Sequence, residues 1–176
     1  MTERLIFGNS VEGMLRALGP GLSPALKSEL VALGVNPDKL LPAYGVPTYL
    51  QLLDFIGGKR FPELQGNERD RALGREFIRG FGQTFVGKAT LSLGRVLGPM
   101  RATLRLTRTM RTVNNYSTSE AIPASDSSVH VWCHPVLRPW YYVGVFEQAG
   151  LELHGPSYVV ELHKFEGERA DFLVRW

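Results

Sequence analysis

The spacing of apolar residues separates a helical part of the chain from an extended part. Through the first two thirds, apolar side chains recur every three or four residues, which is the period of an amphipathic α-helix. Ser23-Pro24 is a helix start, because serine can cap a helix and proline suits the first helical turn. A further helix is expected over 48–58, and residues 40–44 before it are interpreted as a connector.

The longest helical stretch begins near Asn67 and carries two stripes of side chains at four-residue spacing. The apolar stripe consists of Leu73, Phe77, Phe81 and Phe85. The basic stripe consists of Arg71, Arg75 and Arg79. The apolar stripe predicts that Phe77 and Phe81 are core residues, together with Trp140 from a later helix.

Glycine and proline then interrupt the helical pattern. Gly98-Pro99 breaks the helix, and a new helix is expected over 100–111, with Arg101, Arg105 and Arg108 on one face. Glycine costs a helix about 1 kcal/mol relative to alanine, so the glycines in this region need a compensating role. Close packing of helices is the favoured explanation, and a ligand lying against exposed backbone is the alternative. These glycines are Gly74, Gly80, Gly82, Gly87, Gly94 and Gly98.

Beyond Asn115 the pattern changes to that of strands. Short extended segments are expected over 118–131, where apolar and polar residues alternate. Residues 135–150 return to a helix that is apolar nearly all round, as buried helices are. The chain ends in a hairpin made of 158–165 and 170–176. The sequence therefore predicts one α+β domain over residues 1–176, with N-terminal helices followed by a small antiparallel sheet, an inserted helix and a C-terminal hairpin.

Length and composition are those of a globular domain. The 176 residues are enough to bury a core, and 44% apolar with 21% charged residues is typical of globular proteins. No apolar run of about 18 residues predicts a transmembrane segment, and the N-terminus lacks the apolar region of a signal peptide. Cys133 is the only cysteine, so no intrachain disulfide can form. Together these features predict a cytoplasmic protein.

Positive charge is concentrated in the middle of the chain. Between Arg69 and Arg111 there are ten basic and two acidic residues, a net charge of +8, whereas the whole chain carries +3. Such a segment can form an anion-binding face. The alternative is that the arginines coat the solvated sides of amphipathic helices, because arginine is a good helix former. Nucleic acid is an unfavoured partner, since no helix-turn-helix or zinc-finger signature accompanies the charge.

The residue types that usually carry catalysis form no recognisable motif. The histidines show no metal-ligand spacing, and the chain has no G-x-S-x-G elbow, Walker A loop or dinucleotide fingerprint. Cys133 beside His134 could be a nucleophile or a haem thiolate, but a buried cysteine at the end of a strand is commoner. We therefore expect no metal, no cofactor and no enzymatic activity. The four histidines are His130, His134, His154 and His163.

Several segments resemble a myxobacterial family of proteins of unknown function. They are GREFIRGFGQTFVGKA (74–89), RVLGPMR (95–101), RTVNNY (111–116) and WYYVGVFEQAGLE (140–152), with LLPAY (40–44) as a further piece. The likeness covers nearly the whole chain. Membership implies a chain of this length that occurs as many paralogues, and no known activity.

The predicted layout is also similar to that of haem-based nitric oxide sensor domains and the related ligand-binding fold of Golgi vesicle-tethering subunits. The haem-binding members carry a proximal histidine on a helix before the sheet, and a Y-x-S-x-R motif that holds the propionates. Here no histidine precedes His130, and the nearest string, Tyr116 to Glu120, lacks the arginine. The resemblance therefore implies the fold of a ligand-binding sensor that does not bind haem.

The sequence favours a non-catalytic, haem-free binding or regulatory module. Its expected partner is another protein or a small apolar or amphipathic ligand held between the helices and the sheet, and the chain could form a homodimer. The alternative is an anion or nucleic-acid binder that acts through the arginine-rich helices. The candidate ligand- or anion-binding residues are Arg75, Arg79, Arg101, Arg105, Arg108, Arg111, Asn115 and Tyr116.

Overall fold

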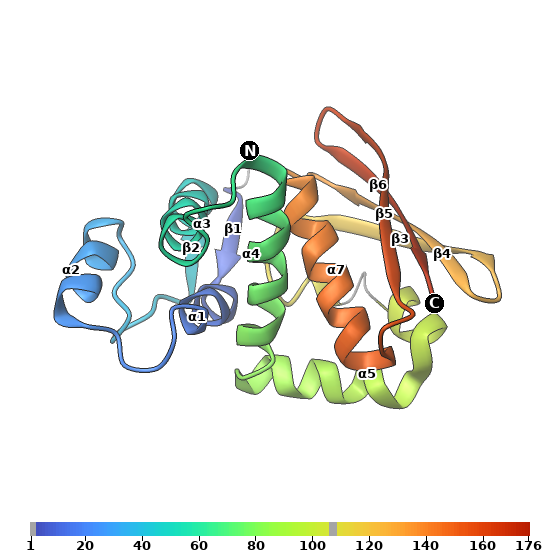
Figure 1. Ribbon diagram of the computed structural model, residues 1–176, viewed down its shortest axis with the longest axis horizontal. Helices are drawn as coiled ribbons and strands as arrows, with labels where there is room; N and C mark the ends of the chain where they lie inside the picture. The colour runs from blue at the N-terminus through green and yellow to red at the C-terminus, as the bar shows by residue number, and fades with distance from the viewer. Residues whose placement is uncertain (1–2, 106–108) are drawn as a thin grey trace.

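The computed structural model describes residues 3–105 and 109–176 and has the predicted α+β architecture. A group of helices stands beside a four-stranded antiparallel sheet, and helix α7 (Pro139–His154) lies between the two (Figure 1). No described helix combines the length and the apolar character that crossing a bilayer requires.

The N-terminal part contains two short strands and three helices. Strand β1 (Leu5–Phe7) pairs antiparallel with β2 (Ala43–Gly45). The predicted connector at 40–44 is therefore wrong at its end, because a three-residue strand is too short to show an alternating pattern. The three helices are α1 (Gly8–Arg16), α2 (Pro24–Ala32) and α3 (Val46–Arg60).

The predicted start of helix α2 is confirmed, whereas helix α3 starts earlier than predicted. The Ser23 hydroxyl accepts a hydrogen bond from the Leu26 amide at 3.2 Å, so the predicted cap of α2 is confirmed. Helix α3 begins at Val46, earlier than the predicted residue 48, with Gly45 in the capping position. It continues to Arg60, because its two late glycines do not end it.

The basic region folds into two consecutive helices, α4 (Gly66–Phe81) and α5 (Phe85–Leu104). The Thr84 hydroxyl accepts the Gly87 amide at 3.0 Å and starts α5 in a new direction. Phe85 is consequently 89% exposed, and the prediction that it continues the apolar stripe of α4 is wrong. Gly98 has φ +73°, so the predicted break in the helix at this point is confirmed as a kink.

The helix after this kink ends earlier than the sequence predicts, although residues 109 and 110 are again helical. It was expected over 100–111, but α5 ends at Leu104 and Arg105 is its C-terminal cap. Arg111 lies in a turn, and Arg108 is outside the described residues. The predicted common face of Arg101, Arg105 and Arg108 includes Arg108 and so lies partly outside the described residues.

The sheet consists of the two predicted extended regions. Its strands are in the order β3-β4-β6-β5, and each neighbouring pair is antiparallel. Helix α7 starts at Pro139 and extends beyond the predicted end at Gly150, which is instead packed against Tyr158. The four strands are β3 (Thr118–Ser125), β4 (Ser128–His134), β5 (Val159–Glu166) and β6 (Arg169–Arg175).

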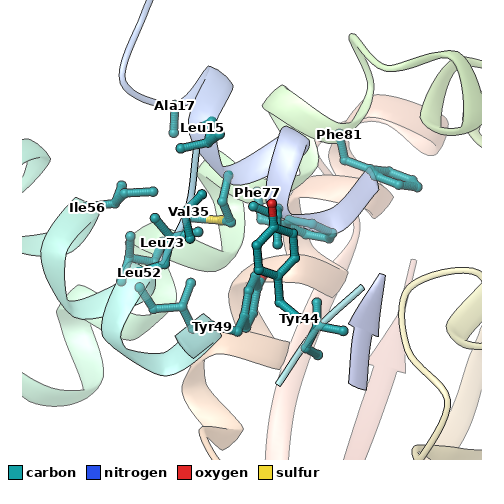
Figure 2. Close-up of a cluster of buried hydrophobic side chains, with 14 of the residues drawn as sticks. Leu15, Ala17, Val35, Tyr44, Tyr49, Leu52, Ile56, Leu73, Phe77 and Phe81 are labelled. Atoms are coloured by element: carbon teal, nitrogen blue, oxygen red, sulfur yellow. The ribbon is translucent and has the colours of Figure 1, made fainter. Parts of the chain in front are cut away.

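Two apolar clusters meet at α7. The first joins α1, α3 and α4 to Tyr141, and part of it is visible in Figure 2. The second joins the inner face of the sheet to Val143 and Phe146. Phe77 and Phe81 are buried, as predicted, whereas Trp140 is only half-buried and packs at the edge of the second cluster.

Glycines allow α4 and α7 to pack backbone against backbone. A Cβ atom at Gly74 would overlap the carbonyl oxygen of Tyr141, and a Cβ at Gly144 would overlap that of Arg71. Gly80 packs in the same way against Gly13 of α1. The predicted packing role of the helical glycines is confirmed at Gly74 and Gly80.

Alanine substitutions test this contact. We expect Gly74→Ala and Gly144→Ala each to lower the free energy of unfolding by about 1–3 kcal/mol or more, because overpacking against rigid backbone separates the helices. Gly58→Ala is the matched control, since nothing lies within 4 Å of its Cβ position on α3, and helix propensity favours alanine there. Urea unfolding followed by circular dichroism measures the difference. Equal midpoints for all three variants would contradict the proposed role of the contact.

Candidate ligand-binding cavity

A cavity of about 170 Å³ lies within the protein, where the N-terminal elements, α4, α5 and α7 meet. Its wall is mostly aliphatic and aromatic. The chain segment between α5 and the sheet closes part of it through Thr109, Met110, Val113, Asn114 and Tyr116. The cavity therefore draws its wall from elements distant in sequence, and only the folded chain forms it.

The side formed by α3 and α4 is built from regularly spaced apolar side chains. Phe77 and Phe81 are one helical turn apart, and their rings stack with centroids 5.4 Å apart. Both line the cavity, and Leu53 of α3 lies on the same wall. The apolar stripe recognised in the sequence of α4 thus serves both the core and the cavity.

Helix α5 supplies a thin wall on the opposite side. Thr90, Leu91 and Gly94 line the cavity in the first part of this helix, and Ala102 does so after the kink. Gly94 lets the side chain of Leu153 from α7 approach the α5 backbone, because a Cβ at this position would lie 2.8 Å from the Leu153 Cδ1 atom.

Residues 113–117, just before the sheet, are fixed by polar contacts. The Asn114 side-chain oxygen accepts hydrogen bonds from the amides of Tyr116 at 3.1 Å and Ser117 at 2.7 Å. The Ser10 hydroxyl of α1 donates to the Val113 carbonyl at 3.1 Å. These contacts hold Tyr116 and Val113 at the cavity wall.

A pair of tyrosine hydroxyls provides polar character at the α3 and α7 side. The Tyr49 and Tyr141 hydroxyls lie 2.9 Å apart, and that of Tyr141 also points to the Met14 sulfur at 3.9 Å. Burial raises the pKa of both tyrosines, so each stays protonated and can donate a hydrogen bond at neutral pH. Burial likewise raises the pKa of Tyr142, a third tyrosine of the wall.

Arg138 is a charged residue of the cavity wall, and two carboxylates balance its charge. It donates to Asp70 of α4 at 3.0 Å and to Asp54 of α3 at 2.7 Å. Burial raises the pKa of Asp70, although Arg138 acts in the opposite direction. Arg138 therefore connects three helices, and its guanidinium is already occupied by carboxylates.

The predicted basic stripe of α4 is largely neutralised within the protein. Arg71 and Arg75 both bind the Glu147 carboxylate of α7, with Nε to Oε2 distances of 2.9 and 3.1 Å. Arg79 pairs with Glu76 on its own helix. Glu147, which lies outside the basic segment, thus supplies a partner for two arginines of the stripe.

The other predicted site residues do not converge on one place. Arg101, Arg105 and Arg111 are exposed, and Arg108 is outside the described residues. Asn115 fastens the N-terminus, since its side-chain oxygen accepts the Leu5 amide at 2.8 Å and its side-chain amide donates to the Glu3 carbonyl at 3.0 Å.

Among the described residues of the predicted set, Tyr116 is the one that lines the cavity. It is half-buried, and burial raises its pKa. The Arg4 guanidinium lies 5.9 Å from its ring centroid. Tyr116 is predicted as a site residue because it follows the basic region. The structure places it among apolar side chains.

The sequence did not identify the buried tyrosine pair. Tyr49 and Tyr141 are single hydroxyl-bearing residues within otherwise apolar helical faces. A buried tyrosine hydroxyl usually finds a hydrogen-bond partner, so the sequence could indicate only that each of these hydroxyls has a partner. It could not show that residues 92 positions apart form the pair.

Cys133 and the histidines lie away from the cavity. The Cys133 side chain is buried on the inner face of the sheet, and burial raises the pKa of its thiol to about 12. His134 follows it on β4 and is exposed, because successive side chains of a strand point to opposite faces. Over residues 3–105 and 109–176, no group of three or more His, Cys, Asp or Glu side chains is placed to hold a metal ion.

Comparison with solved structures identifies the fold as that of H-NOX domains. A doubly substituted H-NOX domain designated Tt aligns with a TM-score of 0.73 and 14% identity, covering 97% of this chain and 94% of its own. An oxygen-binding H-NOX domain related to soluble guanylate cyclases aligns with a TM-score of 0.68 and 16% identity, covering 96% and 91%. A T. tengcongensis H-NOX variant aligns with a TM-score of 0.52 and 16% identity, covering 94% of each chain. The likeness predicted from the element order is confirmed.

The chain belongs to DUF2378, a family of proteins of unknown function, which it matches over residues 4–176. No curated protein matches it. The resemblance to a family without known activity is therefore confirmed. Because the family has no known activity, the fold and the cavity are the findings that bear on function.

The cavity residues do not fit a haem. Haem iron is usually held by histidine, cysteine, methionine with histidine, or tyrosinate. None of the four histidines and not Cys133 lines the cavity, and Met110 there has no histidine across from it. Burial favours the protonated form of the lining tyrosines, which opposes iron binding. The volume of about 170 Å³ is also below the roughly 300–1,000 Å³ typical of sites for larger ligands.

The thiol of Cys133 supplies a test of this placement. We expect it to react with Ellman's reagent at least about a hundredfold more slowly in the native protein than in urea, because burial both shields the sulfur and disfavours the thiolate. Absorbance at neutral pH measures both rates on the same sample. Comparable native and denatured rates would show that Cys133 is accessible and that the strand is wrongly placed.

Proposed function

We propose that this protein is a haem-free, non-catalytic binding module of a cytoplasmic regulatory system, and that its cavity takes a small, largely apolar ligand. The observation that carries the proposal is the partly open cavity of about 170 Å³ with a mostly aliphatic and aromatic wall. Apolar cavities of about 150 Å³ in proteins bind molecules of the size of benzene. A ligand of one or two small rings, or a short aliphatic chain, suits this space.

The polar groups of the wall favour a neutral ligand. Most of them are already bonded within the protein, as described for Ser10, Asn114 and Arg138. The Tyr49 and Tyr141 hydroxyls can offer a single hydrogen-bonding point to a carbonyl, hydroxyl or ring nitrogen. A charged ligand would lose its hydration without gaining a free counter-ion.

Anion binding through the arginines of α4 has less support. Arg71 and Arg75 share the Glu147 carboxylate, whose side chain is only 13% exposed. An external anion would have to displace this partner and leave a largely buried carboxylate unpaired, which is costly. The arrangement supports an internal structural role for these two arginines.

A cavity-filling substitution tests the proposed ligand. Indole and benzene serve as probes, and we expect both to raise the melting temperature of the wild type, because a ligand that binds only the native state stabilises it. Ala102→Phe should abolish this shift by occupying the cavity. Ala89→Phe is the matched control, because Ala89 is on the exposed side of the same helix. If neither probe shifts the wild type and native mass spectrometry of protein from its own host shows no added mass, the proposal is wrong.

A haemin titration tests the haem-free part of the proposal. We expect no sharp stoichiometric Soret band from the wild type, because the cavity lacks a suitable axial ligand. Any broad absorbance should persist in His130→Ala, His134→Ala and Cys133→Ala, since nonspecific haemin depends on no single residue. A stoichiometric band that one of these changes removes would overturn this part.

A further inference from the structure

The outward face of α5 carries an apolar ridge. Phe85 is 89% exposed, Leu93 is 51% exposed and Val96 is 84% exposed. With Ala89, these residues lie within about 80° of one another around the helix, which has 3.6 residues per turn. We define the ridge as Phe85, Ala89, Leu93 and Val96. Single exposed apolar residues are ordinary, but an aligned series on one helix marks an interaction site.

The ridge stands opposite the cavity wall on the same helix. Gly87, Leu91 and Gly94 form the buried side of α5, and Leu91 and Gly94 line the cavity. Figure 1 places the first part of α5 at the lower edge of the molecule, below α4 and α7. The ridge therefore points away from the body of the protein and is not part of its core.

Cations flank the ridge on one side. Lys88 and Arg95 are exposed and, with Arg79 and Glu152, line a shallow depression between α4, α5 and α7. Arg101 is exposed beyond the kink of the same helix. The sequence has no acidic residue between Glu76 and Glu120, although it has seven basic ones there. The surface around the ridge thus combines apolar side chains with an excess of positive charge.

We propose that the α5 ridge binds an anionic lipid bilayer surface. Phe85, Leu93 and Val96 enter the boundary between headgroups and acyl chains, while Lys88 and Arg95 lie beside the lipid phosphates. Amphipathic helices with this combination of an apolar face and flanking Lys or Arg bind membrane surfaces in the plane of the interface. Long basic side chains suit this position because their stems lie along apolar surface while their charges stay in water.

The composition of the ridge argues against a second copy as its occupant. In an antiparallel pair of α5 helices related by a two-fold axis, the Lys88 and Arg95 flanks of the two copies would face each other and repel. A stable protein interface also uses about 20–30 residues a side, far more than the ridge provides. Apolar groups that enter a bilayer need no such matched surface.

The apolar character of the ridge argues against nucleic acid. Phosphate backbones are bound by cations and hydrogen-bond donors, whereas Phe85 and Val96 present large, strongly exposed apolar side chains on α5. Binding to nucleic acid would leave these side chains without a partner and would not depend on them.

Vesicle sedimentation of the full chain tests the inference. We expect the protein to sediment with vesicles of phosphatidylcholine and phosphatidylglycerol at low salt, to be released as salt is added, and to stay in solution with phosphatidylcholine alone. Phe85→Ser with Val96→Ser should weaken the association at least about tenfold, because membrane affinity falls with the apolar surface removed. Lys88→Gln with Arg95→Gln should weaken it and reduce its dependence on salt.

Matched controls separate the ridge from general surface properties. Ile122→Ser with Phe165→Ser removes two exposed apolar residues from the sheet, and Lys39→Gln with Lys164→Gln removes two exposed charges elsewhere. Both controls should sediment close to the wild type. Circular dichroism should show equal unfolding midpoints for the ridge variant and the wild type, since the ridge contributes little to the core.

Several outcomes would overturn the inference. The inference is wrong if the wild type does not sediment with anionic vesicles at low salt. It is also wrong if the ridge variant sediments as the wild type does. A wild-type dimer in solution that the ridge variant converts to a monomer would instead assign the ridge to a second copy. The melting-temperature test with indole and benzene is separate, so the cavity proposal can stand or fall independently of the ridge.

Discussion

The contact between α4 and α7 is the constraint on which the rest of the structure depends. Gly74 and Gly144 let the two backbones meet, and each glycine accommodates a carbonyl group of the other helix. This contact sets α7 in register with α4, so that Glu147 reaches Arg71 and Arg75. It also turns Tyr141 toward the N-terminal helices and Val143 and Phe146 toward the sheet. One helix can serve both clusters only because it is apolar nearly all round.

The same packing accounts for the presence of the cavity. α4 and α7 are held backbone to backbone, whereas α5 has only four buried residues along its length: Gly87, Leu91, Gly94 and Thr103. Its glycines bring it close to its neighbours at Phe81 and Leu153, and beyond the kink at Gly98 the Thr103 hydroxyl lies 3.0 Å from that of Tyr158. The helix therefore closes one side of the cavity without filling it. It also separates the cavity from the apolar ridge on the protein surface.

The H-NOX fold is present here at 14–16% sequence identity to the solved relatives. Fold does not determine function, because function depends on the residues at the site. At 14–16% identity the solved relatives establish the arrangement of helices and sheet, while the lining residues are this chain's own. Tyrosine hydroxyls and an arginine bound by two aspartates stand at the wall. The charge of this arginine is already matched by carboxylates, and the wall offers iron no favourable axial ligand.

The sequence by itself determined the fold class, the hairpin, the cap at Ser23 and the buried character of α7 and of Phe77 and Phe81. Each of these depends on local periodicity or on residues adjacent in the chain. Tertiary structure alone decided the end of the α4 stripe before Phe85, the β1–β2 pairing, and the partners of Arg71 and Arg75. It also decided the Tyr49–Tyr141 pair and the cavity around it. These features join residues far apart in the chain, and the distance between such residues is set by packing, which no local pattern of the sequence encodes.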